Sequence, residues 1–235
     1  MNERPILFSG EMVRAILDGR KTQTRRVVKV LPWTQPPYYF CGDIRNSLGF
    51  PASDGETWAG FTYEKSREND PCFVKCPYGK PGDRLWVRET WNAVHFVPEI
   101  VEGHVTKYSD HWFVSDEIPK NSNNDYWSLC YAADCDSFEL EIVWRPSIFM
   151  PRWASRITLE VVNVRVERLQ DISEEDATAE GVSVPLAGVS EWGGPGEAIY
   201  EYMRLWDSIN AKRGHSWAAN PWVWVIEFKN VSGEK

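Results

Sequence analysis

The residue types best suited to chemistry are crowded in one stretch, Ser9 to Lys29 (SGEMVRAILDGRKTQTRRVVK). Within it, Lys21 precedes Thr24 by three residues. A lysine beside a hydroxyl group can make that hydroxyl nucleophilic when burial lowers the lysine pKa. The spacing therefore suggests a Lys21–Thr24 pair for nucleophilic attack. The alternative is a basic edge strand in solvent, whose charges prevent pairing with other chains.

A short helix followed by a strand must position this pair. Ser9 is a good N-cap, apolar side chains then share one helical face, and Gly19 can end the helix. The β-branched residues from 21 to 28 favour a strand. In a strand Thr24 and Arg26 share one face and Lys21 lies on the other, so Lys21 reaches Thr24 only if the chain bends near Gly19.

The rest of the chain predicts a mixed α+β domain spanning residues 1–235. Extended segments are expected at 5–8, 84–91, 156–168 and 221–228, and helices at 172–181 and 197–209. Two irregular stretches, 31–80 and 92–155, are expected to be large loop insertions, the second with a strand near 127–132. In the segment 156–168 the apolar residues occupy odd positions up to Val161 and even positions from Val162 onward. This change of face predicts a bulge or a strand bent around a barrel.

The predicted helix at 172–181 carries a second candidate for proton transfer. Ser173 and Asp176 form a capping box, and Gly181 supplies the stop. Glu180 lies in the last turn, where the helix dipole disfavours a negative charge. A carboxyl group disfavoured in its charged form is suited to proton transfer, unless it is simply exposed.

Three further residues are candidates for binding a substrate. Glu89 lies at the end of a predicted strand, where it forms either a structural salt bridge or an ion pair with Lys21 or Arg26 in a pocket. Arg152 and Trp153 follow a proline-stiffened loop. Such a pair suits a flat ring beside an anion, and the alternative is a tryptophan buried under a surface arginine.

Composition narrows the class of protein. The chain has 235 residues, 43% of them hydrophobic and 26% charged, and a formal net charge of -8. An acidic protein is a poor non-specific binder of long nucleic acids, so a nucleoside, a nucleotide or a short single strand is the favoured partner.

No apolar run reaches the length of a membrane span, and the N-terminus lacks the apolar core of a signal peptide, so a cytoplasmic protein is expected. Five cysteines are expected to be reduced, and their spacing does not favour a metal site.

The pattern Gly19-x-Lys21-x-x-Thr24-x-Arg26, between a helix and a strand, resembles the signature of ASCH domains. The resemblance extends to the segments 4–29, 82–91, 156–182 and 197–230. It implies a PUA-like mixed β-barrel with flanking helices. GDRLWVRETW, MPRWASRITLE and NPWVWVIEF also look like segments of larger ASCH-like proteins of phages and prophages.

With threonine at position 24, the motif is similar to that of small ASCH amidohydrolases, which remove the acyl group from N4-acetylcytidine. The resemblance implies Thr24 as nucleophile, Lys21 as proton acceptor and Glu180 as proton donor. Arg26, Glu89, Arg152 and Trp153 would bind the substrate, and no metal or cofactor is required. The alternatives are a non-catalytic module that binds a nucleobase, RNA or DNA, and a ribonuclease.

Overall fold

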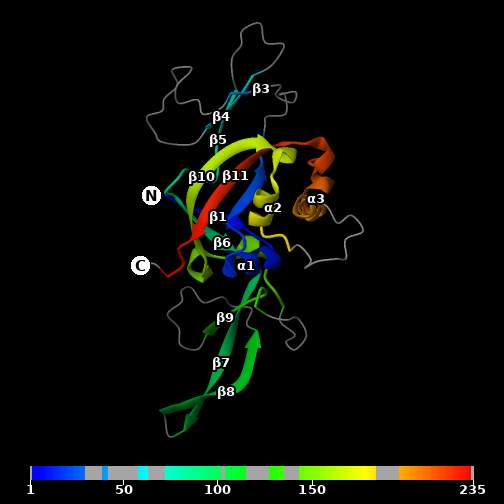
Figure 1. Cartoon of the computed structure of the whole chain (residues 1–235). Helices are drawn as coiled ribbons and strands as arrows, with labels where there is room; N and C mark the ends of the chain where they lie inside the picture. The colour runs from blue at the N-terminus through cyan, green and yellow to red at the C-terminus, as the bar shows by residue number, and fades with distance from the viewer. Residues whose placement is uncertain are drawn as a thin grey trace.

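The computed structural model describes most of the chain: residues 2–29, 39–41, 58–62, 72–101, 104–114, 127–134, 143–183 and 196–233. Its centre is a five-stranded sheet with the order β1-β6-β10-β11-β2 (Figure 1). These strands are β1 (Glu3–Leu7), β6 (Arg84–Arg88), β10 (Thr158–Arg168), β11 (Trp222–Asn230) and β2 (Gln23–Val27). β1 runs parallel to β6, and the other neighbouring pairs are antiparallel. The mixed α+β class expected from the sequence is therefore present.

The sheet is open across the described residues, whereas the sequence analysis expected a closed barrel. β1 and β2 are its two edges. A side chain links these edges in place of a backbone ladder, because Arg26 of β2 donates from Nη2 to the carbonyl oxygen of Leu7 at 2.6 Å. The contact between the two edges that the structure shows here is thus made by a side chain and not by paired backbones.

The change of apolar face within the segment 156–168 is a β-bulge, which is one of the two alternatives that the sequence predicts. The register between β10 and β11 shifts between Val161 and Asn163. The bulge turns Val162 outward, where it is 51% exposed. Val164 and Val166 therefore pack on the same core cluster as Leu159 and Val161. One extra residue lets a single strand present apolar side chains to one side along its length.

In the described part of the chain, three α-helices flank the sheet: α1 (Gly10–Leu17), α2 (Glu174–Ala179) and α3 (Glu197–Asn210). α1 begins after Ser9, although the Ser9 side chain makes no capping hydrogen bond, and it ends before Gly19, whose φ is +74°. Ser173 does cap α2, because its hydroxyl accepts from the Asp176 amide at 3.1 Å. α2 and α3 cover one face of the sheet, with Tyr202 and Trp206 of α3 packed against Val223 and Val225 of β11. Among the described residues, no helix combines the length and the apolar composition needed to cross a bilayer.

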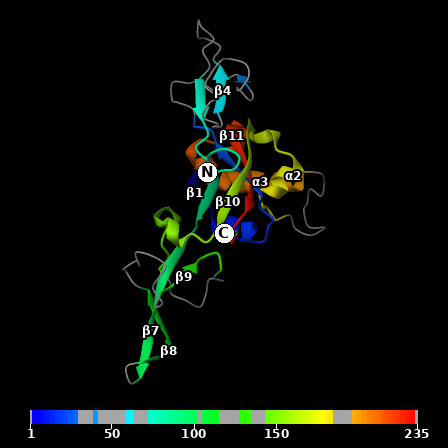
Figure 2. The ribbon, with the colours of Figure 1, turned by 90° about the vertical axis from the view of Figure 1, so that its left-hand side faces the viewer.

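The two stretches expected to be loop insertions contain strands. β3 (Tyr39–Cys41), β4 (Trp58–Thr62) and β5 (Cys72–Lys75) form one three-stranded sheet. β7 (Trp91–Val101), β8 (His104–Val114) and β9 (Trp127–Tyr131) form another, with β7 in the middle. The strand expected near 127–132 is thus confirmed. Figures 1 and 2 show the two small sheets extending from opposite ends of the central one.

A buried ion pair fixes the β7–β9 sheet to the central sheet. Glu89, between β6 and β7, has a side chain that is 1% exposed, and it accepts two hydrogen bonds of 3.0 Å from Arg156. Arg156 also bonds Asp134, just after β9, at 2.6 Å, and its guanidinium group lies 4.0 Å from the centre of the Tyr131 ring. Burial raises the pKa of Glu89, and Arg156 opposes that effect. Glu89 thus has a structural partner, which was one of the two alternatives in the sequence analysis.

The junction predicts unequal effects of two substitutions. Arg156→Met leaves the Glu89 carboxylate buried with no cation, and it is expected to lower the free energy of unfolding by about 3 kcal/mol. Asp134→Asn removes a half-exposed carboxylate, and its cost is expected to stay below about 1 kcal/mol. Urea unfolding followed by tryptophan fluorescence measures both. Equal losses in the two variants would contradict the structural role of the Glu89–Arg156 pair.

Candidate functional site

The turn between α1 and β2 is attached to α1 and to the end of α2 by one backbone hydrogen bond each. The Lys21 amide donates to the carbonyl oxygen of Ala15 in α1 at 2.9 Å. The Thr22 amide donates to the carbonyl oxygen of Ala179 in α2, also at 2.9 Å. The bend expected at Gly19 is therefore present, and it lays residues 20–22 alongside residues 179–181.

Lys21 and Glu180 meet inside this contact. Nζ of Lys21 donates to Oε2 of Glu180 at 2.7 Å and to the Glu180 carbonyl oxygen at 2.7 Å. The two side chains are 1% and 4% exposed. The ammonium group thus neutralises the carboxylate and also binds a carbonyl group at the C-terminal end of α2. The two residues are far apart in the chain, and their contact agrees with the shared site that the motif resemblance implies for them.

Burial changes the proton affinity of Lys21. Desolvation of the ammonium group lowers the Lys21 pKa, the negative charge of Glu180 opposes this effect, and the nearby positive charges of Arg26 and Arg25 add to it. Nζ also lies 5.6 Å from the centre of the Phe8 ring. A lysine with a lowered pKa can lose its proton more easily and act as a base.

Arg25 extends the ion pair into a larger network that the sequence analysis did not predict. Its side chain is fully buried, and Nη2 contacts carboxylate oxygens of Glu167 at 2.5 Å and Asp176 at 2.8 Å. Nη1 lies 3.4 Å from Oε1 of Glu180. Arg165 of β10 joins the network through Glu167, Asp176 and Glu227. The network holds α2 against β2, β10 and β11 and restricts the position of Glu180.

Tyr202 is a second residue that the sequence analysis assigned no functional role. It belongs to the apolar stripe of α3 and is 3% exposed, and the Arg25 guanidinium lies 5.9 Å from the centre of its ring. Burial raises the Tyr202 pKa well above its ordinary value, and the negative charge of Glu180 raises it further. A tyrosine at helical spacing resembles any core aromatic residue, so the sequence carries no signal for its place beside Glu180.

Thr24 lies on the other face of β2 from Arg25. It is 4% exposed and pairs with Ile226 of β11. Arg26 shares its face, and the Arg26 guanidinium lies 5.1 Å from the centre of the same Phe8 ring that Lys21 approaches. Among the described residues, the Thr24 hydroxyl makes no hydrogen bond with Lys21 or Glu180. The structure therefore joins Lys21 and Glu180 directly and places Thr24 beside Arg26 on the strand that follows.

Three of the predicted substrate-binding residues have structural partners of their own. Glu89 pairs with Arg156 and with neither Lys21 nor Arg26. Arg152 is 43% exposed and pairs with Glu3 at 2.8 Å, at the other end of β1 from Phe8. Trp153 packs edge-on against Trp91, with 6.0 Å between ring centres. The structure places these three where β7–β9 and the 143–156 segment join the central sheet and gives them partners other than Lys21. Glu89 thus follows the salt-bridge alternative, and a role of the three in binding a substrate stays a prediction.

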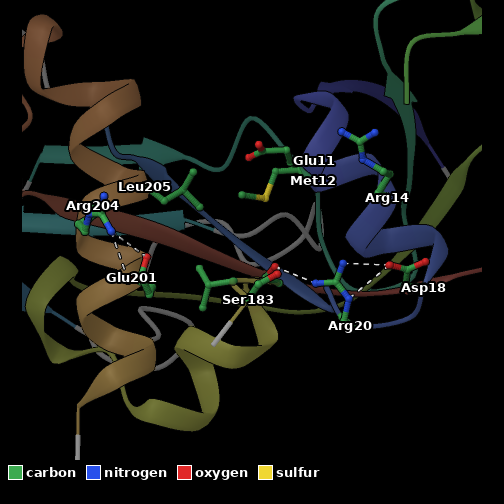
Figure 3. Close-up of a pocket in the computed structure, with 11 residues that line it drawn as sticks. Glu11, Met12, Arg14, Asp18, Arg20, Ser183, Glu201, Arg204 and Leu205 are labelled. Carbon is green, nitrogen blue, oxygen red and sulfur yellow. Dashed lines mark hydrogen bonds and ion pairs between the residues drawn. The ribbon is translucent and has the colours of Figure 1, made fainter. Parts of the chain in front are cut away.

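A cavity of about 600 Å³ lies beside Gly181, between α1 and α3 (Figure 3). α1 and α3 form its walls, and residues 181–183 form its floor. Arg20 and Gly181 contribute to it, whereas their neighbours Lys21 and Glu180 do not. The Lys21–Glu180 pair is therefore buried behind this cavity.

No protein-family model, curated protein or solved structure matches this chain. The resemblance to ASCH domains therefore depends on the motif residues alone. The function has to be inferred from the chemistry of Lys21, Thr24, Glu180 and the groups that surround them.

Close packing at Gly181 generates a prediction with a matched control. Gly181 has φ +84°, and a Cβ there would lie 2.8 Å from the Lys21 Cβ and 2.9 Å from the Ala15 Cβ. Gly19 has φ +74° with open space around it. Gly19→Ala is expected to cost about 1 kcal/mol of stability from backbone strain alone, and Gly181→Ala about 2 kcal/mol more because of overpacking. Thermal unfolding measures the difference, and equal costs would mean that Gly181 does not pack against Lys21.

The buried pair predicts strong coupling between its members. Lys21→Met is expected to lower the free energy of unfolding by about 3 kcal/mol, because Glu180 loses its closest cation. The double variant Lys21→Met/Glu180→Gln should cost at least about 1 kcal/mol less than the sum of the two single variants. The exposed neighbouring pair is the control. Arg20→Met breaks the 2.9 Å contact with Asp18 and one hydrogen bond of 3.2 Å to the Gly181 carbonyl oxygen, and it leaves no buried charge without a partner. That loss should remain under about 1 kcal/mol, and additive effects at Lys21 and Glu180 would show that they do not interact.

Proposed function

We propose that this chain is an amidohydrolase that removes the acyl group from N4-acylated cytidine or a related modified nucleoside. One observation carries the proposal: the 2.7 Å contact between the buried Lys21 ammonium and Glu180 carboxylate groups, at the start of the strand that carries Thr24. The motif resemblance to ASCH amidohydrolases supports the same assignment of roles. It also supports assigning the curved, bulged sheet to the PUA-like fold.

The buried pair supplies both a base and an acid from one shared proton. Moving the proton from Nζ to the Glu180 carboxylate gives a neutral amine and a carboxylic acid without changing the net charge. Burial lowers the pKa of Lys21, so Nζ gives up this proton more readily than an exposed lysine would. Lys21 is then able to accept a proton while Glu180 is able to donate one.

The reaction then follows two balanced steps. Thr24 Oγ1 attacks the acyl carbon and loses its proton to Lys21, and the C–N bond breaks as Glu180 protonates the leaving amine. This leaves acyl-threonine, a Lys21 ammonium and a Glu180 carboxylate. Water then attacks the ester and loses a proton to Glu180, while Lys21 returns a proton to Thr24. The products are the free nucleoside and a carboxylic acid, and both groups regain their starting protonation.

Arg26 is suited to hold the oxyanion that forms in both steps. It shares the Thr24 face of β2, and its Nε is buried without a hydrogen-bond partner among the described residues. A preorganised donor of this kind stabilises the charge that develops on the acyl oxygen. Because Lys21, Thr24 and Glu180 are each at most 4% exposed, binding of substrate requires the side chains that cover this face to move.

Turnover of N4-acetylcytidine, followed by ultraviolet absorbance, tests the proposal. Thr24→Val keeps the shape of the side chain and removes the nucleophile, so turnover should fall to the background rate. Thr24→Ser should keep measurable turnover. Lys21→Met should reduce kcat by about 10²–10⁴-fold, the usual contribution of a general base. Thr22→Val is the control, because Thr22 is also a threonine, two residues before Thr24, but its side chain is exposed. This variant should leave turnover unchanged.

Other outcomes would identify a different function. Wild-type turnover in Thr24→Val would remove Thr24 from the mechanism. Saturable binding of the nucleoside with no turnover in the wild type would indicate a non-catalytic nucleobase-binding module. Cleavage of RNA that requires Lys21 would indicate a ribonuclease.

A further inference from the structure

The central sheet carries a row of arginine side chains on a face that no α-helix covers there. Leu85 and Val87 of β6 belong to the apolar core. The alternate residues Arg84, Trp86 and Arg88 therefore point to the opposite face. α2 and α3 pack on that face over β11, away from β1 and β6 (Figure 1). In the described part of the chain, the area over β1 and β6 is thus open to a partner.

The carboxylates on this face have cations of their own. Glu3 of β1 pairs with Arg152 at 2.8 Å, and Glu160 of β10 pairs with Lys229 at 3.2 Å. Arg84 is the register partner of both Glu3 and Glu160. Even so, neither arginine of β6 forms an ion pair within the described residues. The face therefore holds four cations and two carboxylates, and its excess of positive charge favours an anionic partner.

Trp86 supports the neighbouring guanidinium groups. The Arg88 guanidinium lies 4.6 Å and the Arg152 guanidinium 6.0 Å from the centre of the Trp86 ring, which is 8% exposed. Stacking on a ring uses no N–H donor, because the donors of arginine lie in the guanidinium plane. Arg88 donates from Nη1 to the Ile148 carbonyl oxygen at 3.2 Å. Within the described residues its Nη2 makes no hydrogen bond, so it remains for a phosphate oxygen.

An exposed aromatic side chain lies next to the Arg88–Ile148 contact. Ile148 and Phe149 are 58% and 69% exposed, although both side chains are apolar. The loop 146–151 that carries them begins and ends with proline, and its Met150 is buried in a core cluster. A stiff loop thus presents an aromatic ring beside unpaired guanidinium groups. Single-stranded nucleic acids bind to this combination, with bases stacked on rings and phosphates held by cations.

We propose that this face of β6 binds a single-stranded nucleic acid. Arg84 and Arg88 bind phosphates, and a base stacks on Phe149. The two arginines are four residues apart on an extended strand, which separates their Cα atoms by about 13 Å. This spacing suits a chain of phosphates that lies along β6 better than a single phosphate.

The surface is separate from the Lys21–Glu180 site. Thr24 pairs with Ile226, which belongs to the core on the other face of the sheet. A strand of nucleic acid on the β6 face therefore does not occupy the Thr24 site, and its binding does not depend on acyl hydrolysis.

Fluorescence anisotropy with a labelled deoxythymidine oligonucleotide of about 10 nucleotides tests this surface. Binding to the wild type should be saturable at low salt. The logarithm of the association constant should fall with the logarithm of salt concentration with a slope of about −1.4, as expected for two phosphates. Arg84→Gln and Arg88→Gln should each weaken binding and reduce the size of this slope by about 0.7. Phe149→Ser should weaken binding about tenfold and leave the slope unchanged.

Two exposed residues outside this face provide matched controls. Tyr200 lies on α3 and Arg213 just after it, and both side chains are exposed. Tyr200→Ser and Arg213→Gln should bind the oligonucleotide as the wild type does. Melting temperatures confirm that each variant is folded.

Three results would overturn the proposal: no saturable binding to the wild type, a salt slope unchanged in both arginine variants, or unchanged binding in Phe149→Ser. Binding to phosphatidylserine vesicles that requires Phe149, with no binding to the oligonucleotide, would identify a membrane-binding surface instead. If N4-acetylcytidine is not turned over but these variants weaken oligonucleotide binding as expected, the hydrolase proposal fails and the nucleic-acid surface stands.

Discussion

A buried ammonium and a buried carboxylate 2.7 Å apart hold the end of α2 against the start of β2. Each group has lost nearly all of its contact with water, so each depends on the other for compensation. The backbone reinforces the contact, because residues 20–22 and 179–181 are hydrogen-bonded to each other on both sides of the pair. The geometry of Lys21 and Glu180 is therefore determined by the fold as a whole.

Neighbouring charged side chains offset the cost of burying the Lys21–Glu180 pair. Arg25, fully buried, contacts three carboxylates, and Arg165 shares two of these with it. Such a network satisfies the oxygens of Glu167 and Asp176 and leaves Glu180 to be divided between Lys21 and Arg25. A rigid network of this kind restrains the position of Glu180, as the mechanism proposed above requires of its proton donor. The same packing buries the three residues of that mechanism, so the proposal also requires the covering side chains to move.

The sequence predicted well those features that depend on local patterns. The helix ending at Gly19, the capped helix after Ser173 and the bulge after Val161 each follow from residues close together in the chain. The pairing of Lys21 with Glu180 was predicted through a motif. The roles of Arg25 and Tyr202 were missed, because their partners come from other elements. Arg25 lies in the crowded basic stretch, but the pattern does not say which of its cations is buried, and Tyr202 resembles any core aromatic residue. Arg152 and Trp153 were misplaced for the opposite reason. Their local chemistry suits ligand binding, but Arg152 forms an ion pair with Glu3 and Trp153 packs against Trp91. Both partners are distant in sequence.

The central claim is that burial beside Glu180 makes Lys21 a better base than an ordinary lysine. Nuclear magnetic resonance of protein labelled with ¹³C at lysine Cε measures this directly, with the Lys21 signal assigned by its loss in Lys21→Arg. The structure predicts that the Lys21 pKa lies below the ordinary value of a lysine side chain. A Lys21 pKa at or above that ordinary value would contradict the account.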